Sequence, residues 1–411
     1  MSSVYGLNVP NDWEVVALDQ IKSDEKKALI SGPFGSNISA KYFTPTGVPV
    51  IRGNNLSLDV FTRFKENGFV FVSPEKADEL GTWAQADDII FTAVGTLGQI
   101  GLLSDNQDYP RYIISNKQIR LRLNQEKVTP QFVYYWLASD LMQEVIEQRN
   151  TGSSVPLINL GVVKNLLIPL PPLPEQKAIA SVLSSLDDKI DLLHRQNKTL
   201  EAMAETLFRQ WFIEEAKEDW EGFSVSDIAI HVKDNVNPSK DPLKTFYHFS
   251  LPAFDSGQKP TIEVGSDILS NKYRVAENSI LISKLNPRVP RVWLLTNAEE
   301  NYVCSTEFQN LKPKVAPHLM FLYSLFSSRN VIDELTMSAS GTSGSHQRVK
   351  PEDMLNVTFR TPSLDYLEEY SLLITPSMEK VSFNKKQIQT LENLRDTLLP
   401  KLMSGEVRVQ Y

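Results

Sequence analysis

The chain contains an internal two-fold repeat, and such a repeat limits the possible architectures more than any local motif does. Asp12-Trp13-Glu14 near the start has a copy at Asp219-Trp220-Glu221, close to the middle of the chain. Thr199-Leu200-Glu201 has a copy at Thr390-Leu391-Glu392, and in both places a second Thr-Leu pair follows at the same spacing. The sequence therefore predicts two copies of one plan, each a globular unit followed by a long helix.

The composition indicates a globular protein with more than one domain. A length of 411 residues exceeds one ordinary hydrophobic core and suits two domains with connectors. No apolar run reaches the roughly 18 residues of a membrane span, and the start of the chain lacks the pattern of a secretion signal. Cys304 is the only cysteine, which excludes an internal disulfide and fits a reducing compartment. We therefore expect a cytoplasmic protein without a membrane partner.

Residues 1–170 and 214–362 are predicted to be two globular domains of mixed α/β structure, so that the fold class is α+β. Short β-like runs are punctuated by Gly and Pro in the first domain, and one helix is expected from Pro130 to Arg149. In the second domain, Ser279–Ser283 takes the place of the β-like run Asp88–Thr92. Pro317–Leu335 takes the place of the Pro130 helix. The remaining β-like runs of the first domain are Val48–Ile51, Phe69–Val72 and Gln118–Leu123.

A long helix is expected after each domain, within 171–213 and 363–411, with helical cores at about 174–213 and 365–403. Apolar residues in the first stretch alternate steps of four and three, which is the heptad spacing of a coiled coil. Because one plan occurs twice, the two helices should pack antiparallel around a pseudo-two-fold axis. Pro376 is expected to kink the second helix or to split off its first turns. The predicted coiled-coil residues are Leu183, Leu186, Ile190, Leu193, Asn197, Leu200, Leu207, Val381, Ile388, Leu391 and Leu398.

The sequence shows no catalytic centre. The five histidines lie too far from one another and from Cys304 to suggest a metal cluster, and no phosphate-binding glycine loop occurs. Asn286-Pro287-Arg288 begins like a methyltransferase loop but departs from it at the third position. We therefore expect no catalytic residue, no metal and no cofactor.

Two segments resemble the conserved regions of the specificity subunits of type I restriction-modification systems. Leu170-Pro171-Pro172-Leu173-Pro174-Glu175-Gln176, with the helical pattern through Ile190, resembles the central region of that family. Leu391–Leu402, followed by Ser404-Gly405-Glu406-Val407, resembles the distal region. The repeat layout agrees along the whole chain. One departure is that Asp365–Glu369 replaces the clean Pro-Leu-x-Glu-Gln start in the second copy.

The resemblance implies a non-catalytic DNA reader in a complex of modification and restriction subunits. Each globular domain would be a target recognition domain that reads one half of a split, asymmetric sequence in double-stranded DNA. The helices would set the spacing and dock two modification subunits, and restriction subunits would complete the nuclease. Basic and polar side chains beside Gly- or Pro-rich loops are the predicted DNA contacts: Lys117, Arg120, Arg122, Lys284, Arg288, Arg291, His346, Gln347 and Arg348.

Two other functions compete with DNA reading. A coiled-coil scaffold that only joins protein partners gives no reason for basic groups to cluster in both domains. The formal net charge of −8 does count against DNA binding by bulk electrostatics, unless partner subunits complete the DNA-binding surface. A fused nuclease or methyltransferase would need a metal or cofactor motif, and the sequence shows neither.

Overall fold

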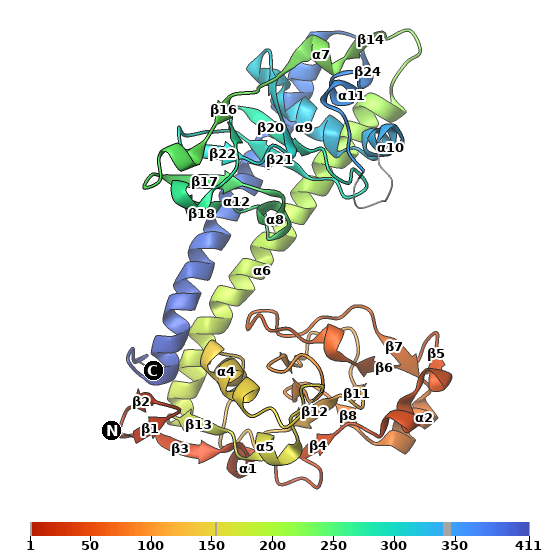
Figure 1. The fold of residues 1–411 in the computed structure, drawn as a ribbon. Helices are drawn as coiled ribbons and strands as arrows, with labels where there is room; N and C mark the ends of the chain where they lie inside the picture. The colour runs from red at the N-terminus through yellow and green to blue at the C-terminus, as the bar shows by residue number, and fades with distance from the viewer. Residues whose placement is uncertain (1, 153, 340–346, 411) are drawn as a thin grey trace. The chain divides into compact units, whose positions relative to one another are not determined.

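The computed structural model describes residues 2–152, 154–339 and 347–410, which form two compact units. Unit 1 comprises Met1–Leu192 and Gln387–Tyr411, and unit 2 comprises Leu193–Lys386. The two long helices in Figure 1, α6 (Leu173–Arg209) and α12 (Leu364–Ser404), each contribute one segment to each unit. Every unit is therefore a mixed α/β body built around two helix segments.

Unit 1 contains a four-stranded antiparallel sheet and a five-stranded mixed sheet. The first has the order β10-β9-β12-β4, and the second has the order β5-β7-β6-β11-β8 with β6 and β11 parallel. The strands of the first are β10 (Ile100–Leu102), β9 (Ile89–Thr92), β12 (Gln118–Leu121) and β4 (Leu29–Ser31). Those of the second are β5 (Phe43–Thr44), β7 (Val70–Val72), β6 (Val48–Ile51), β11 (Tyr112–Ile114) and β8 (Trp83–Ala84).

Unit 2 repeats this topology except at the edges of the five-stranded sheet, where the strand that comes first in the chain lies at opposite edges in the two units. Its four-stranded sheet has the order β15-β23-β20-β21, and its five-stranded sheet has the order β16-β19-β22-β17-β18 with β17 and β22 parallel. The strands are β15 (Ala229–His231), β23 (Phe308–Pro313), β20 (Ser279–Ser283), β21 (Val292–Leu295), β16 (Asn235–Val236), β19 (Lys272–Arg274), β22 (Tyr302–Cys304), β17 (Thr245–Phe249) and β18 (Thr261–Val264). The predicted repeat and mixed fold class are confirmed.

A short two-stranded sheet stands at the entrance to each long helix. In unit 1, β3 (Glu14–Ala17) pairs with β13 (Leu167–Leu170), and in unit 2, β14 (Glu221–Ser224) pairs with β24 (Thr358–Thr361). The predicted strands at Val48–Ile51 and Ser279–Ser283 are confirmed with the same bounds. The smaller elements are β1 (Ser2–Val4), β2 (Leu7–Val9), α1 (Leu18–Ile21), α2 (Pro74–Leu80), α5 (Leu160–Lys164), α7 (Val225–Ile228), α8 (Leu251–Asp255) and α11 (Pro351–Leu355).

The single helix expected from Pro130 to Arg149 was wrong, because α3 (Pro130–Leu137) and α4 (Asp140–Gln148) are separate helices. The Ser139 hydroxyl donates to the Trp136 carbonyl at 2.7 Å, and the Ser139 backbone is extended. The same correction applies to the second domain, where α9 (Leu319–Ser327) and α10 (Arg329–Ser338) replace the one helix expected over Pro317–Leu335. Ser328 there donates to the Leu325 carbonyl at 2.6 Å. A local serine turn thus ends each first helix.

The segments of α6 and α12 pack antiparallel in both units, as predicted. In unit 1, Asp187 faces Arg395, and Ile179 shares an apolar cluster with Leu402. In unit 2, Asn197 faces Asn384, whereas Trp211 further along α6 stacks on Tyr366 earlier in α12.

The expected split of the second helix at Pro376 was wrong, because α12 runs unbroken from Leu364 to Ser404. Pro376 is exposed, and so is Leu372, whose carbonyl the proline leaves without its helical N–H partner. Water can satisfy that carbonyl, so a proline at this position does not end the helix.

Candidate nucleic-acid interface

A polar pocket opens in unit 1 where the loops after β6, β9 and β11 meet. Its volume is about 520 Å³. Its apolar lining comes from Ile38, Phe43, Val50 and Val94, together with Gly53. Its polar lining comes from Arg52, Asn54, Thr92, Thr96, Gln99, Ser115, Asn116, Lys117 and Gln118. No carboxylate lines the pocket, which is therefore rich in neutral amides and cationic groups.

The floor of this pocket carries donors that the described part of the protein leaves unused. Gln118 is 1% exposed and accepts a hydrogen bond from the Ser115 hydroxyl, whereas its Nε2 has no partner among the described residues. Arg52 donates from Nη2 to the Gly68 carbonyl at 2.7 Å, and its buried Nε likewise lacks a described partner. Buried donors without partners cost free energy unless water or a ligand satisfies them.

Lys117 stands at the edge of the pocket with an exposed side chain. Its carbonyl accepts the backbone N–H of Ala93 at 2.8 Å and of Val94 at 3.3 Å, which holds the loop before β12 against the end of β9. Asn116 beside it is also exposed. The backbone is thus held while both polar side chains face solvent.

Arg120 and Arg122, the other two predicted contacts in unit 1, form hydrogen bonds inside the fold. Arg120 is 5% exposed and donates to the backbone carbonyls of Trp83 and Lys27. Arg122 donates to both carboxylate oxygens of the buried Asp88 at 2.8 Å. These bonds join the sheet to neighbouring loops, so only Lys117 among the three predicted residues presents a free charged end to the pocket.

The corresponding surface of unit 2 is defined by matching backbone bonds. Lys284 N–H donates to the Glu307 carbonyl at 2.9 Å, as Ala93 N–H does to Lys117. The β-bridge between Leu285 and Arg348 matches the bridge between Val94 and Leu157. Asn286 N–H donates to the Gln347 carbonyl at 2.9 Å, as Gly95 N–H does to that of Pro156. Lys284, Gln347 and Arg348 are therefore brought together at the equivalent of the unit 1 pocket edge.

Two ion pairs occupy this surface of unit 2. Arg348 binds Glu307 through Nε at 3.2 Å and Nη2 at 3.0 Å, and these hydrogen bonds raise the pKa of Arg348. Arg291 binds Asp255 through Nε at 2.7 Å and Nη2 at 2.9 Å, which lowers the pKa of Asp255. Arg288 is exposed on the preceding loop, and His346 lies outside the described residues.

Reasoning from charge missed the neutral amides of the unit 1 pocket. Asn54, Gln99 and Asn116 come from three loops that meet only because β6, β9 and β11 are neighbours across two sheets. A signal was present, because each of these residues follows or precedes a predicted strand by a few positions. A carboxamide, like a guanidinium, can make paired contacts to a base edge.

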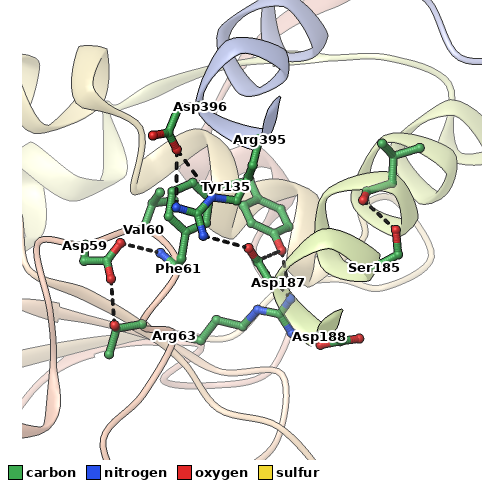
Figure 2. Close-up of polar contacts among 12 residues, drawn as sticks. Asp59, Val60, Phe61, Arg63, Tyr135, Ser185, Asp187, Asp188, Arg395 and Asp396 are labelled. Atoms are coloured by element: carbon green, nitrogen blue, oxygen red, sulfur yellow. Dashed lines mark hydrogen bonds and ion pairs between the residues drawn. The ribbon is translucent and has the colours of Figure 1, made fainter. Parts of the chain in front are cut away.

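The helix segments of unit 1 meet around a buried carboxylate (Figure 2). Asp187 is 7% exposed, accepts from the Tyr135 hydroxyl and pairs with Arg63 at 3.2 Å. Arg395 of α12 approaches the same carboxylate at 3.5 Å, and its guanidinium lies against the Phe61 ring. Burial raises the pKa of Asp187, although Tyr135, Arg63 and Arg395 oppose this effect. The network joins both helices to a loop and a helix of the globular part.

The helix segments of unit 2 meet around a pair of amides. Asn384 is fully buried and donates from Nδ2 to Oδ1 of Asn197 at 2.9 Å.

Six of the predicted coiled-coil residues are buried, namely Leu183, Ile190, Leu193, Asn197, Val381 and Ile388. The other five are half-buried, namely Leu186, Leu200, Leu207, Leu391 and Leu398. Position 187, not 186, lies at the centre of the seam, because Asp187 is held there by its three partners.

Three segments that are far apart in the sequence meet at Glu175, which is fully buried in unit 1. Trp13 donates to it from Nε1 at 3.2 Å, and Arg408 donates from Nη2 at 2.8 Å while also pairing with Asp12 at 2.9 Å. In unit 2, Tyr366 stands where Glu175 stands in unit 1 and packs on Trp220. The second copy lacks the Glu-Gln start because an aromatic contact replaces the carboxylate network.

Two kinds of site are missing from the described residues. No group of three or more His, Cys, Asp or Glu side chains there could hold a metal ion. Within the same residues, no helix combines the length and apolar character that crossing a membrane requires.

Residues 10–202 match the family model of the type I restriction modification DNA specificity domain. The MjaIX specificity subunit of the type I restriction enzyme from Methanocaldococcus jannaschii is 25% identical, over 78% of this chain and 78% of its own length. The MjaVIII specificity subunit of the same organism is 21% identical, over 99% of this chain and 96% of its own. The crystal structure of a type I restriction-modification S subunit from M. genitalium has the same fold, with a TM-score of 0.64, 17% identity and 98% coverage of both chains.

Proposed function

We propose that this chain, which belongs to the specificity subunits of type I restriction-modification systems, reads a DNA target of two separate halves. As a specificity subunit it is a non-catalytic component of its complex. Residues 1–170 would form one target recognition domain and residues 214–362 the other. Each domain would read one half of an asymmetric sequence.

The observation that carries this proposal is the repeated recognition surface. The edge of the unit 1 pocket and the Arg348 surface of unit 2 are built by the same backbone bonds between equivalent strands. Their side chains nevertheless differ, with amides and Lys117 in one and arginine–carboxylate pairs in the other. One scaffold with two sets of polar side chains suits two different base sequences.

The helices would serve as spacer and as docking site for two modification subunits. Each unit contains one segment of α6 and one of α12, so a partner that recognises the helix pair would find its site twice. Restriction subunits would then join to form the nuclease. Two readers on one face of B-DNA should contact sites separated by about one helical turn, which is roughly 34 Å, or by a multiple of that distance.

Methylation mapping tests this proposal directly. The chain would be expressed with its modification subunits in cells without other adenine methylation, and methylated adenines would be mapped by single-molecule sequencing. We expect one asymmetric motif of two short halves with a constant gap. Exchanging residues 214–362 for those of a relative should change one half and leave the other half and the gap alone. If both halves changed together, or neither did, the two domains would not be independent readers; if the complex bound no DNA, a protein scaffold would be the better description.

A further inference from the structure

We infer that Arg348 and Glu307 together read a guanine·cytosine base pair in the half of the target that unit 2 recognises. This inference rests on the proposed function and names the bases that one of its two surfaces selects. It follows from the geometry of the ion pair, from its place in the sheet and from the charges around it.

The ion pair leaves the reading edge of the arginine open. Glu307 engages Nε and Nη2 of Arg348 at 3.2 and 3.0 Å, so the outer edge formed by Nη1 and Nη2 remains unused by the carboxylate. The side chains are 55% and 32% exposed, which places that edge within reach of a ligand. An arginine edge donates two bonds to O6 and N7 of guanine, and each carboxylate oxygen of Glu307 can accept a further bond from N4 of cytosine.

The backbone holds both partners in place. Arg348 forms a β-bridge with Leu285, and the next residue, Val349, donates to the Lys284 carbonyl at 2.9 Å. Glu307 accepts the Lys284 N–H at 2.9 Å through its own carbonyl, so one residue anchors both sides of the ion pair. Side chains on a rigid frame hold a paired contact more accurately than side chains on a free loop.

The surroundings favour an approaching DNA strand. Burial lowers the pKa of Lys284, and the nearby charges of Lys233 and Arg348 lower it further, so Lys284 has a cation on either side. Arg291, just before β21, is held by Asp255 at 2.7 Å, and Arg288 is exposed. These cations can bind phosphates, while the ion pair provides the directional contacts.

Unit 1 provides an internal comparison. Its equivalents of Arg348 and Glu307 are Leu157 and Lys117, at the matching bridge and the matching backbone bond. An apolar side chain and an ammonium group cannot form the same paired donor and acceptor. The paired reader therefore belongs to unit 2 and distinguishes the two halves of the target.

The test replaces Arg348 by Lys in the complete complex with modification subunits, and methylated adenines are mapped as above. Lysine keeps the positive charge but replaces the planar fork by a single ammonium group, so phosphate binding survives while the paired contact with guanine is weakened. We expect discrimination at one G·C position to fall roughly 5- to 150-fold. Recognition of the other half and the gap should stay unchanged, which also shows that the variant is folded.

Arg329→Lys is the matched control, because Arg329 forms an exposed ion pair with Asp333 on α10 and should leave the motif unchanged. A motif that Arg348→Lys leaves unchanged, while Arg348→Ala lowers methylation evenly at all sites, would show a phosphate contact and overturn the inference. The exchange of residues 214–362 shows which half of the native target unit 2 reads. If that half contains only A·T pairs, the inference is overturned as well. Failure of the native complex to give any two-part motif would instead remove the proposed function itself.

Discussion

Replacing Asp187 by Asn should loosen unit 1 around its helix segments more than any other single change in the network of Figure 2. The carboxylate serves Tyr135, Arg63 and Arg395, and Arg395 is itself only 7% exposed. Removing one partner of a buried ion pair costs about 3–5 kcal/mol, because the remaining charge stays buried without compensation. Asp396 and Asp188 still face the two arginines at 3.3 and 3.8 Å, so we expect the lower end, about 3 kcal/mol.

Arg395→Met should cost less than Asp187→Asn. The carboxylate would keep the Tyr135 hydroxyl and Arg63, and Arg395 forms only an ion pair with it at 3.5 Å, without a hydrogen bond, so the loss should stay below about 3 kcal/mol. The double variant should cost less than the sum of the two, with a coupling of about 0.5–3 kcal/mol. A larger loss of stability for Asp187→Asn than for Arg395→Met would show that the carboxylate holds the network together. The reverse order would show that Arg395 does.

Hydrogen exchange measured by mass spectrometry can follow these effects locally, because it gives the opening free energy of each peptide. The relevant peptides are those of residues 179–192 and 387–404, where the two helix segments of unit 1 lie. Asp188→Asn is the control, since its side chain is 73% exposed and its contact with Arg63 should contribute within about 1 kcal/mol. Equal losses of protection in Asp187→Asn and Asp188→Asn would refute the reasoning.

Three further predictions concern unit 2. Leu193→Ala should destabilise the helix pair by about 2–5 kcal/mol in denaturant unfolding, because the side chain is 1% exposed, whereas the neighbouring Leu192, 40% exposed, should tolerate Ala with little change. Asn197→Leu should cost about 1–3 kcal/mol by leaving the Asn384 amide only its long contact with Gln196 at 3.5 Å, and the Leu–Leu double variant should recover stability in the same measurement. Burial and the nearby Lys233 and Lys284 lower the pKa of His231 from 6.5 to about 4, so the unfolded state binds its proton first as the pH falls. Stability should therefore decline from pH 6.5 towards 4, and His231→Gln should flatten that decline in pH-dependent unfolding.

The architecture could be predicted from the sequence because its signals are local and occur twice. β9 and β20 are continuous apolar runs, and the heptad spacing of α6 needs no knowledge of distant residues. The serine turns at Ser139 and Ser328 could not be predicted from periodicity, since the apolar pattern continues across them. A single hydroxyl bond to a carbonyl three residues earlier decides where the first helix ends.

The candidate contacts were harder to predict, because the environment of an arginine depends on its partners. Arg122 and its partner Asp88 are far apart in the chain, and nothing near Arg122 reveals that its guanidinium is used. Glu307 is likewise remote from Arg348, so the open edge of that arginine became visible only in the structure. The polar seam residue Asp187 was overlooked because the regular steps of four and three, which include the polar Asn197, assign the neighbouring Leu186 to the seam.

The discontinuity of unit 1 affects the order in which the chain can complete its cores during synthesis. Unit 2 occupies Leu193–Lys386 without interruption, whereas unit 1 needs Leu402 and Met403 to cover Ile179 and Leu183. At about 5–20 residues per second, the ribosome needs on the order of ten to forty seconds to proceed from Leu193 to Met403. During that interval the first helix segment must keep an apolar stripe uncovered. The unit that begins first is therefore the last to have all of its residues.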